Sequence, residues 1–200
     1  MIILGLTGPS GAGKTAFSRI LTLKGFPTIN ADELYHSMLK PPSVVLDAIR
    51  DSFGDSFFNE NGELDRKALG KFVFSSSERL DKLNATVLPL VTQRMKSIAE
   101  SFEANGAKLL IIDAPTLFEA GYDKSCDVTV SVLASPLTRI ERISKRDGIS
   151  RDDAIFRIKA QKDDSFYRER SDRVIMNDSS EDELRQSAEA LLNELFGEKI

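Results

Sequence analysis

Eight residues near the start of the chain carry its clearest chemical signal. The segment Gly8-Pro9-Ser10-Gly11-Ala12-Gly13-Lys14-Thr15 fits the pattern G-x-x-x-x-G-K-[ST] at every fixed position. Glycines let such a loop fold back on itself and point backbone N–H groups inward, where a β-carbon would obstruct them. Lys14 can then reach the β- and γ-phosphates of a nucleotide, and the Thr15 hydroxyl is placed for Mg²⁺. The segment therefore predicts a site for a nucleoside triphosphate.

Two aspartates are candidates for the chemistry beside the phosphates. Asp113 ends the apolar run "KLLIID", where its carboxylate can face Mg²⁺ directly or through water; a strand-end turn is the alternative. Asp32 follows a short second strand and is predicted at the edge of the sheet beside the loop. There it can orient and deprotonate an attacking hydroxyl. Asp32 is also a candidate helix N-cap, a role that can coexist with the first.

Arginines C-terminal to residue 135 are the candidate cations for the transferred phosphoryl group. Arg139, Arg142 and Arg146 are spaced i, i+3 and i+7, so they share one helix face. Arg142 and Arg146 are predicted to contact phosphate, because guanidinium forks match phosphate oxygens. A solvated position is favoured for Arg139. Arg157 follows on the next helix.

The bulk properties restrict the class of protein. The 200 residues are 41% hydrophobic and 29% charged, the net charge is −4 and the pI about 5.2, a balance that argues against a nucleic-acid partner. No segment approaches the roughly 20 apolar residues of a membrane span, and the N-terminal apolar run is short for a signal peptide. A cytoplasmic protein without a membrane partner is expected. No feature indicates an oligomeric state.

Neither the single cysteine nor the single histidine is favoured as a catalytic residue. One cysteine, Cys126, excludes an internal disulfide, and we interpret it as a packing residue at a strand edge. His36 lies one turn beyond Asp32, where a structural role or a contact with substrate phosphate is favoured over acid–base catalysis. One histidine also argues against a zinc cluster.

The elements that must position these residues alternate along the chain. Strands are predicted at Ile2–Leu6, Pro27–Ala31, Lys108–Asp113, Asp127–Ala134 and Asp172–Asn177. Helices are predicted at Lys14–Lys24, Asp32–Leu39, Ser43–Phe53, Asp65–Phe74, Ser77–Thr86, Pro89–Ala104, Ser135–Arg146, Arg151–Lys162 and Ser180–Phe196. The alternation predicts an α/β fold with a parallel five-stranded sheet flanked by helices.

One domain with subdomains is expected. Its core comprises about residues 1–31, 107–146 and 171–200. A helical insertion occupies about 32–106, and a helical lid about 147–170.

The absence of two sequence motifs reduces the classes of nucleotide-binding protein that the chain can belong to. A switch GTPase would carry N/T-K-x-D after a late strand, and a transporter-type ATPase would carry Ser-Gly-Gly-Gln; the chain has neither. The class that is left is a small phosphotransferase that encloses its substrate.

Further motifs, in order, resemble the dephospho-coenzyme A kinase family over nearly the whole chain. "LGLTGPSGAGKT" resembles its first strand and phosphate loop, "INADELYH" its second-strand motif, "LNATVLPLV" its helix junction and "DAPTLFE" its third-strand motif. "RISKRDGIS…RIKAQ" is similar to its lid, matching Arg142, Arg146, Arg157 and Gln161, and "SDRVIMNDSSEDEL" to its last strand and the turn near the adenine. The chain departs from the family at Leu88, where histidine is usual, at Thr116, at Asn30 and within the loop.

The resemblance implies ATP-dependent phosphorylation of the ribose 3′-hydroxyl of dephospho-coenzyme A, the last step of coenzyme A biosynthesis. It implies Asp32, Lys14, Arg142 and Arg146 as catalytic residues and Thr15 and Asp113 as magnesium ligands. The helical insertion would bind the acceptor. The residues implied in ATP binding are Gly8, Ser10, Gly11, Ala12, Gly13, Lys14, Thr15, Ala16, Arg142 and Asn177.

Two alternatives stay open at this point. The first is another small kinase, acting on a nucleoside, a nucleotide or a shikimate-type acceptor. The second is a nucleotide-binding regulator without transfer activity.

Overall fold

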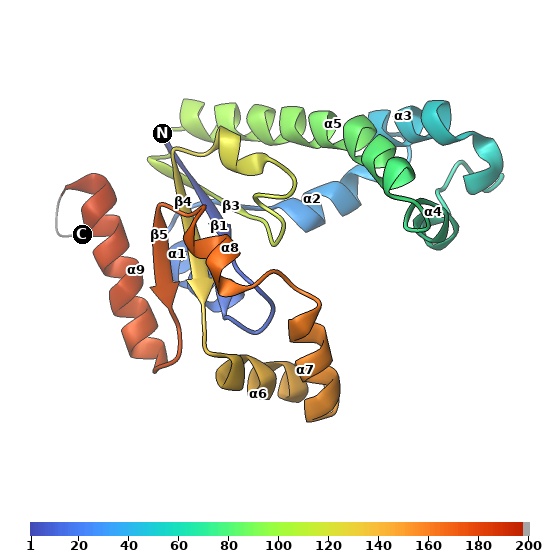
Figure 1. The fold of residues 1–200 in the computed structure, drawn as a ribbon. Helices are drawn as coiled ribbons and strands as arrows, with labels where there is room; N and C mark the ends of the chain where they lie inside the picture. The colour runs from blue at the N-terminus through green and yellow to red at the C-terminus, as the bar shows by residue number, and fades with distance from the viewer. Residues whose placement is uncertain (198–200) are drawn as a thin grey trace. The chain divides into compact units, whose positions relative to one another are not determined.

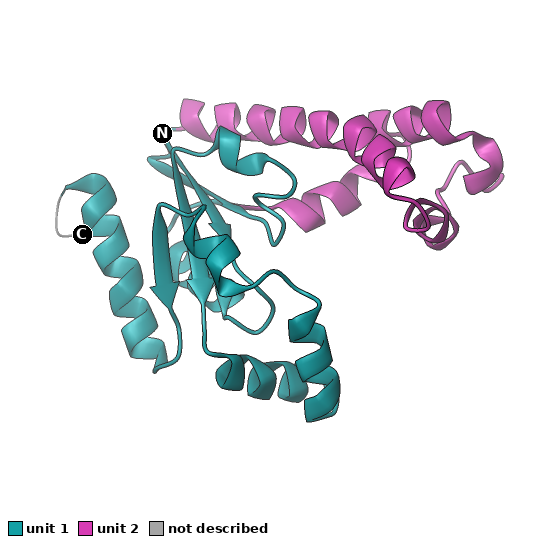
Figure 2. Ribbon diagram, viewed as in Figure 1, with its two compact units in different colours: residues 1–28, 106–200 teal, residues 29–105 magenta. Residues whose placement is uncertain are grey.

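The computed structural model describes residues 1–197, which fall into two compact units (Figure 2). Unit 1 contains residues 1–28 and the chain from Gly106 onward, and unit 2 contains residues 29–105. The last three residues of the predicted core, 198–200, lie outside the described part.

A five-stranded sheet forms the centre of the fold, in the order β2-β3-β1-β4-β5 (Figure 1). Each strand lies close to its predicted position: β1 Ile2–Thr7, β2 Thr28–Asn30, β3 Leu109–Asp113, β4 Val128–Leu133 and β5 Arg173–Met176. Strand β1 pairs in parallel with β3 and β4, and β4 pairs in parallel with β5. The structure thus confirms the predicted α/β fold with a parallel sheet.

The main core of unit 1 covers one face of this sheet. In β1, β3 and β4 every second side chain points to that face, as the two-residue period of a strand requires. Helices α1 (Lys14–Leu23) and α9 (Glu181–Phe196) pack against it and against each other. The buried residues of this core include Leu4, Leu6, Phe17, Leu21, Leu109, Ile111, Val130, Val132, Leu184 and Leu192.

Three further helices of unit 1 follow β4. They are α6 (Pro136–Asp147), α7 (Arg151–Lys159) and α8 (Asp164–Arg168); a short 3-10 turn, η2 (Tyr122–Ser125), precedes β4. Helices α6 and α7 pack on each other through a small apolar cluster of their own. Ser150 caps α7 and accepts a hydrogen bond from the Asp153 N–H at 3.1 Å, as its spacing predicts. Helix α8 was not predicted, because five residues are too few for a periodic pattern.

Unit 2 is helical. It contains α2 (Ala31–Met38), α3 (Val44–Phe53), the 3-10 turn η1 (Asp55–Phe57), α4 (Arg66–Val73) and α5 (Ser77–Ala104). Helix α5 is the longest, and α2, α3 and α4 all pack against it. No helix among residues 1–197 is both long enough and apolar enough to cross a membrane.

The prediction of two helices, Ser77–Thr86 and Pro89–Ala104, is wrong. Pro89 lies inside the single helix α5, and Figure 1 shows that this helix changes direction part of the way along. A proline removes one N–H donor and kinks a helix, yet it need not end it. Here the buried residues Val87, Val91, Met95 and Ala99 recur every four positions, so one packed face continues past the proline.

Candidate active site

The predicted phosphate loop connects β1 to α1, and three of its residues require glycine. Gly8, Gly11 and Gly13 have φ values of 149°, 80° and 95°, conformations that other residues rarely adopt. A β-carbon on Gly8 would lie 2.2 Å from the carbonyl oxygen of Val132. The loop therefore lies so close to β4 that a side chain cannot be accommodated there.

The loop carbonyls are held by side chains from elsewhere in unit 1. Arg139 Nε donates to the Ser10 carbonyl at 3.0 Å, and Arg142 Nη1 donates to the Gly11 and Ala12 carbonyls at 3.4 and 3.3 Å. Asn177 Nδ2 donates to the Ala12 carbonyl at 2.8 Å. In a trans peptide the C=O and N–H point in opposite directions. Fixing the Ser10 and Ala12 carbonyls therefore turns each following N–H group, of Gly11 and of Gly13, away from the side chain that holds the carbonyl.

Lys14 and Asp113 form an ion pair at the end of the central strands. Asp113 is the last residue of β3 and lies opposite Leu6 of β1 in the sheet. Lys14 Nζ bonds to the Asp113 carboxylate, and the two side chains are only 14% and 6% exposed. Thr15, by contrast, is exposed in the first turn of α1. The predicted phosphate lysine and the predicted metal aspartate are thus brought into direct contact.

The three arginines of α6 share one face, as predicted, and that face contacts the loop. Arg146 Nη2 donates to the Ser10 hydroxyl at 3.2 Å, alongside the Arg139 and Arg142 contacts. The prediction that Arg139 is solvated is wrong, because its residue is only 3% exposed. Burial lowers the pKa of its guanidinium, while Asp164, 3.7 Å away, favours the charge. Its hydrogen bond to the Ser10 carbonyl and its ion pair with Asp164 make burial possible, since a buried charge must be paired.

Arg146 also shares a carboxylate with Arg157. Asp147, at the end of α6, bonds to both Arg146 and Arg157, with an Arg146 Nε–Oδ1 distance of 2.7 Å. The hydrogen bond from Arg146 is the main cause that lowers the pKa of Asp147 to about 2. The carboxylate therefore stays charged at neutral pH and holds the two predicted lid arginines side by side.

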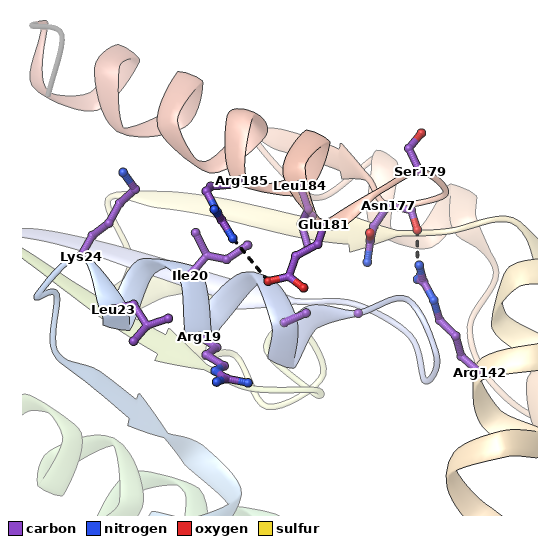
Figure 3. Close-up of a pocket in the computed structure, with 12 residues that line it drawn as sticks. Arg19, Ile20, Leu23, Lys24, Arg142, Asn177, Ser179, Glu181, Leu184 and Arg185 are labelled. Carbon is purple, nitrogen blue, oxygen red and sulfur yellow. Dashed lines mark hydrogen bonds and ion pairs between the residues drawn. The ribbon is translucent and has the colours of Figure 1, made fainter.

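A pocket of about 790 Å³ adjoins the loop (Figure 3). Its size lies within the range of small-molecule sites. It combines apolar side chains of α1 and α9 with the guanidinium of Arg142, which donates to the Asn177 carbonyl at 2.9 Å. Four predicted nucleotide residues, Gly13, Ala16, Arg142 and Asn177, lie in its wall. The other lining residues are Arg19, Ile20, Leu23, Lys24, Ser179, Glu181, Leu184 and Arg185.

The predicted base, Asp32, belongs to unit 2. It lies exposed in the first turn of α2, and no hydrogen bond or ion pair of its carboxylate is found within residues 1–197. The alternative role of Asp32 as helix N-cap is not found: Asn30 is the N-cap, and its side chain accepts from the Glu33 N–H at 3.1 Å. The Asp32 carboxylate is therefore not used by the helix terminus. His36, one turn on, is hydrogen-bonded to Arg66 at 2.7 Å.

The oxygen donors near the loop suit magnesium better than a metal bound by the protein alone. No group of three or more His, Cys, Asp or Glu side chains among residues 1–197 could hold an ion. Magnesium is commonly held by one or two protein oxygens together with substrate phosphates and water. The Thr15 hydroxyl and the Asp113 carboxylate, both beside the phosphate loop, are donors of that kind.

Gln161 is the site residue to which the sequence assigned no role. It follows α7, and its Oε1 accepts from the Ser10 N–H at 3.1 Å and from Arg139 Nη2 at 2.8 Å. The only signal in the sequence was its match to the lid motif.

Cys126, in contrast, is a packing residue as predicted: its Sγ would lie 2.8 Å from a β-carbon on Gly5, and burial raises its pKa to about 12.

Comparisons with known proteins identify the family of this chain. The family model described as dephospho-CoA kinase matches residues 2–183. The dephospho-CoA kinase of Arabidopsis thaliana is 35% identical over 98% of this chain and 84% of its own length. That of Geobacillus kaustophilus is 33% identical over 96% of each chain. The solved structure of dephospho-CoA kinase from Campylobacter jejuni shares the fold, with a TM-score of 0.67 and 24% identity over 96% of both chains. The chain therefore belongs to the dephospho-CoA kinase family.

Proposed function

We propose that the chain transfers the γ-phosphoryl group of ATP to the ribose 3′-hydroxyl of dephospho-coenzyme A, giving coenzyme A and ADP. The observation that carries the proposal is the phosphate loop with its anchored carbonyls, in a chain of this family. The Gly11 and Gly13 N–H groups follow these anchored carbonyls and are proposed to face the phosphate, next to the N-terminus of α1. This is the arrangement that binds phosphate in nucleotide kinases.

The nucleotide is proposed to lie along the loop, with its base in the adjoining pocket. The N–H groups of Gly11 to Thr15 bind the β-phosphate, and Lys14 leaves Asp113 to bridge the β- and γ-phosphates. The apolar side chains of this pocket suit a planar nucleotide base, and the guanidinium of Arg142 suits the negatively charged phosphates. Because Arg142 Nη1 is occupied by three carbonyls, this position supports a nucleotide-binding role for Arg142 more than a direct role in transfer.

Magnesium is proposed to accompany the nucleotide phosphates. The residues that would hold it are Thr15, through its hydroxyl, and Asp113, once Lys14 has moved to the phosphates. When bound, the ion would neutralise charge on the phosphate oxygens. The pairing of Lys14 with Asp113 places both groups at the end of β3, beside the phosphate loop.

Asp32 is proposed to orient the acceptor hydroxyl and to take its proton. As the 3′ oxygen forms its bond to the γ-phosphorus, the bond between that phosphorus and the β–γ bridging oxygen breaks, and the bridging oxygen leaves with ADP. The unpaired, exposed carboxylate of Asp32 is available for this step. Residues 32–106 are proposed to hold the acceptor. Residues 147–170 are proposed to close over the transfer path with Arg146 and to exclude water.

Turnover with a panel of acceptors tests this proposal. Mg²⁺-ATP is supplied with dephospho-coenzyme A, with nucleosides and nucleotides, and with shikimate, and the phosphorylated product is identified by mass. ATP-dependent 3′-phosphorylation of dephospho-coenzyme A is expected. Phosphorylation of a nucleoside with none of dephospho-coenzyme A would instead favour another small kinase.

A substitution of Asp32 separates a kinase from a nucleotide-binding regulator. Asp32→Asn is expected to lower kcat by several orders of magnitude and to leave ATP affinity nearly unchanged, because the carboxylate acts mainly in the transition state. Glu33→Gln is the matched control, since Glu33 is an exposed carboxylate in the same helical turn. If the two variants were equally active, Asp32 would not be the base.

A further inference from the structure

Ser10 is held on both of its backbone polar groups by a pair of side chains. Its N–H donates to Gln161 Oε1 at 3.1 Å, and its carbonyl accepts from Arg139 Nε at 3.0 Å. Arg139 and Gln161 are themselves joined, with 2.8 Å between Arg139 Nη2 and Gln161 Oε1. The three residues close a ring of hydrogen bonds, which we call the Ser10 clamp. A clamp of this kind fixes two consecutive peptide planes of the phosphate loop.

The clamp is built from a buried charge. Arg139 is 3% exposed, and each of its three guanidinium nitrogens has a partner: Ser10, Gln161 and, at 3.7 Å, Asp164. Both partners of Gln161 Oε1 are donors, so the position requires an acceptor. A buried donor that loses its acceptor costs more free energy than a bond at the surface. Burial therefore makes the loop conformation sensitive to the chemistry of residue 161.

We propose that Arg139 and Gln161 are positioning residues for phosphoryl transfer, which act through Ser10 on the loop N–H groups. The inference rests on the proposed kinase function. With the Ser10 carbonyl held by Arg139, the Gly11 N–H is turned to the opposite side of the loop, toward the phosphate. Pre-oriented N–H donors stabilise the charge that develops on the phosphates without reorganisation during the reaction.

The clamp also connects the loop to the segment proposed as the lid. Gln161 lies between α7 and α8, and Asp164 is the first residue of α8. A displacement of this segment would withdraw the acceptor from both the Ser10 N–H and the buried guanidinium. The segment 147–170 and the loop should therefore adopt their nucleotide-binding arrangement together. Gln161 would do this without contacting either substrate.

The test compares substitutions that keep or remove the acceptor at position 161. Gln161→Met is close in size but lacks an acceptor of this strength, whereas Gln161→Glu keeps an oxygen there. Gln161→Met is expected to weaken ADP binding and to raise the KM for ATP about tenfold, the effect of one lost buried hydrogen bond. The KM for dephospho-coenzyme A should be unchanged. Gln161→Glu should restore ATP KM to within about threefold of the unmodified chain.

A control variant and a second substitution at position 161 complete the test. Lys159→Met is the control, because Lys159 is exposed at the end of α7 and has no contact with the loop. Gln161→Asn, whose shorter side chain withdraws the oxygen from both donors, repeats the test if Gln161→Met unfolds. Its ATP KM should also rise. The proposal is overturned if acceptor-lacking variants bind ADP as the unmodified chain does, or if Gln161→Glu is as impaired as Gln161→Met.

ADP binding distinguishes failure of the clamp from failure of the kinase proposal. It is measured by titration calorimetry without any acceptor, so it reports on the clamp even if dephospho-coenzyme A is not turned over. An unmodified chain that is inactive on dephospho-coenzyme A would contradict the proposed function. A selective loss of ADP binding in Gln161→Met would still support the clamp in that case.

Discussion

Gly13 is the loop residue whose substitution has the most clearly defined cost. Its φ is 95°, and a β-carbon there would lie 2.0 Å from Asn177 Nδ2 and 3.3 Å from Asn177 Cγ. Asn177 is only 5% exposed, and its Nδ2 donates to the Ala12 carbonyl at 2.8 Å. The amide cannot move aside without breaking that hydrogen bond. Gly13→Ala therefore combines a backbone strain with the loss of a specific contact.

The two contributions can be estimated separately. Placing alanine in the left-handed region costs about 1–2 kcal/mol. Losing the Asn177 hydrogen bond costs about 1–3 kcal/mol, at the lower end here because Arg142 still donates to the same carbonyl at 3.3 Å. The free energy of unfolding should thus fall by roughly 2–4 kcal/mol. Nucleotide affinity should fall as well, since the Ala12 carbonyl anchor orients the Gly13 N–H.

A double-mutant cycle with Asn177→Ala separates the two contributions. In that background the clash is absent, so Gly13→Ala should cost only the backbone strain, about 1–2 kcal/mol. Gly25→Ala is the matched control, because Gly25 has a φ of 92° with no atom within 4 Å of its β-carbon position. Urea unfolding measures all four variants. An equal cost of Gly13→Ala in both backgrounds would refute the reasoning from the Asn177 contact.

Two further predictions concern the stability and reactivity of unit 1. Asp172 accepts hydrogen bonds from the side chain and the backbone of Thr129, which lower its pKa; its stabilisation is therefore present above about pH 4 and lost as the pH falls further. Asp172→Asn should lower Tm at pH 7, and the difference from the unmodified chain should shrink on acidification, as measured by thermal melts; a constant difference would contradict this. Cys126, with its pKa raised to about 12 by burial, should react with a thiol reagent at pH 8 about a thousandfold more slowly than in urea. Similar rates in both conditions would show that the thiol is not buried.

Features with a local cause could be predicted from the sequence. The strands of the sheet have short apolar runs, the phosphate loop has its glycines, and Ser150 has the spacing of a capping residue, so each was predicted near its observed place. The Pro89 prediction failed because a proline is a local signal, whereas the continuation of α5 depends on packing against α2, α3 and α4. The alternative of Asp32 as helix N-cap could not be decided from the sequence, since Asn30 and Asp32 are both residue types that cap helices.

The environment of Arg139 could not be predicted, because it depends on contacts distant in the chain. Its spacing with Arg142 and Arg146 indicated a common helix face, and that much is confirmed. Whether that face is exposed to solvent or buried against protein depends on where α6 lies relative to the loop. Ser10, which Arg139 contacts, is 129 residues earlier in the chain. A charged residue on a helix is ordinarily exposed. The positions of the loop, of Gln161 and of Asp164 provide the partners that make burial of Arg139 possible.

These contacts also explain why the loop motif predicts a phosphate site but does not predict how the loop backbone is held in place. The motif fixes glycines and the Lys14-Thr15 pair, while Ser10 and Ala12 occupy unrestricted positions. Yet the anchoring hydrogen bonds involve backbone groups of Ser10 and Ala12: the Ser10 N–H donates one, and the Ser10 and Ala12 carbonyls accept the others. Ala12 is also fully buried. A backbone group is present whatever the side chain, so the pattern leaves these positions free. The information that orients the loop instead lies in Arg139, Arg142, Gln161 and Asn177, and substitutions there should alter nucleotide binding although the motif remains intact.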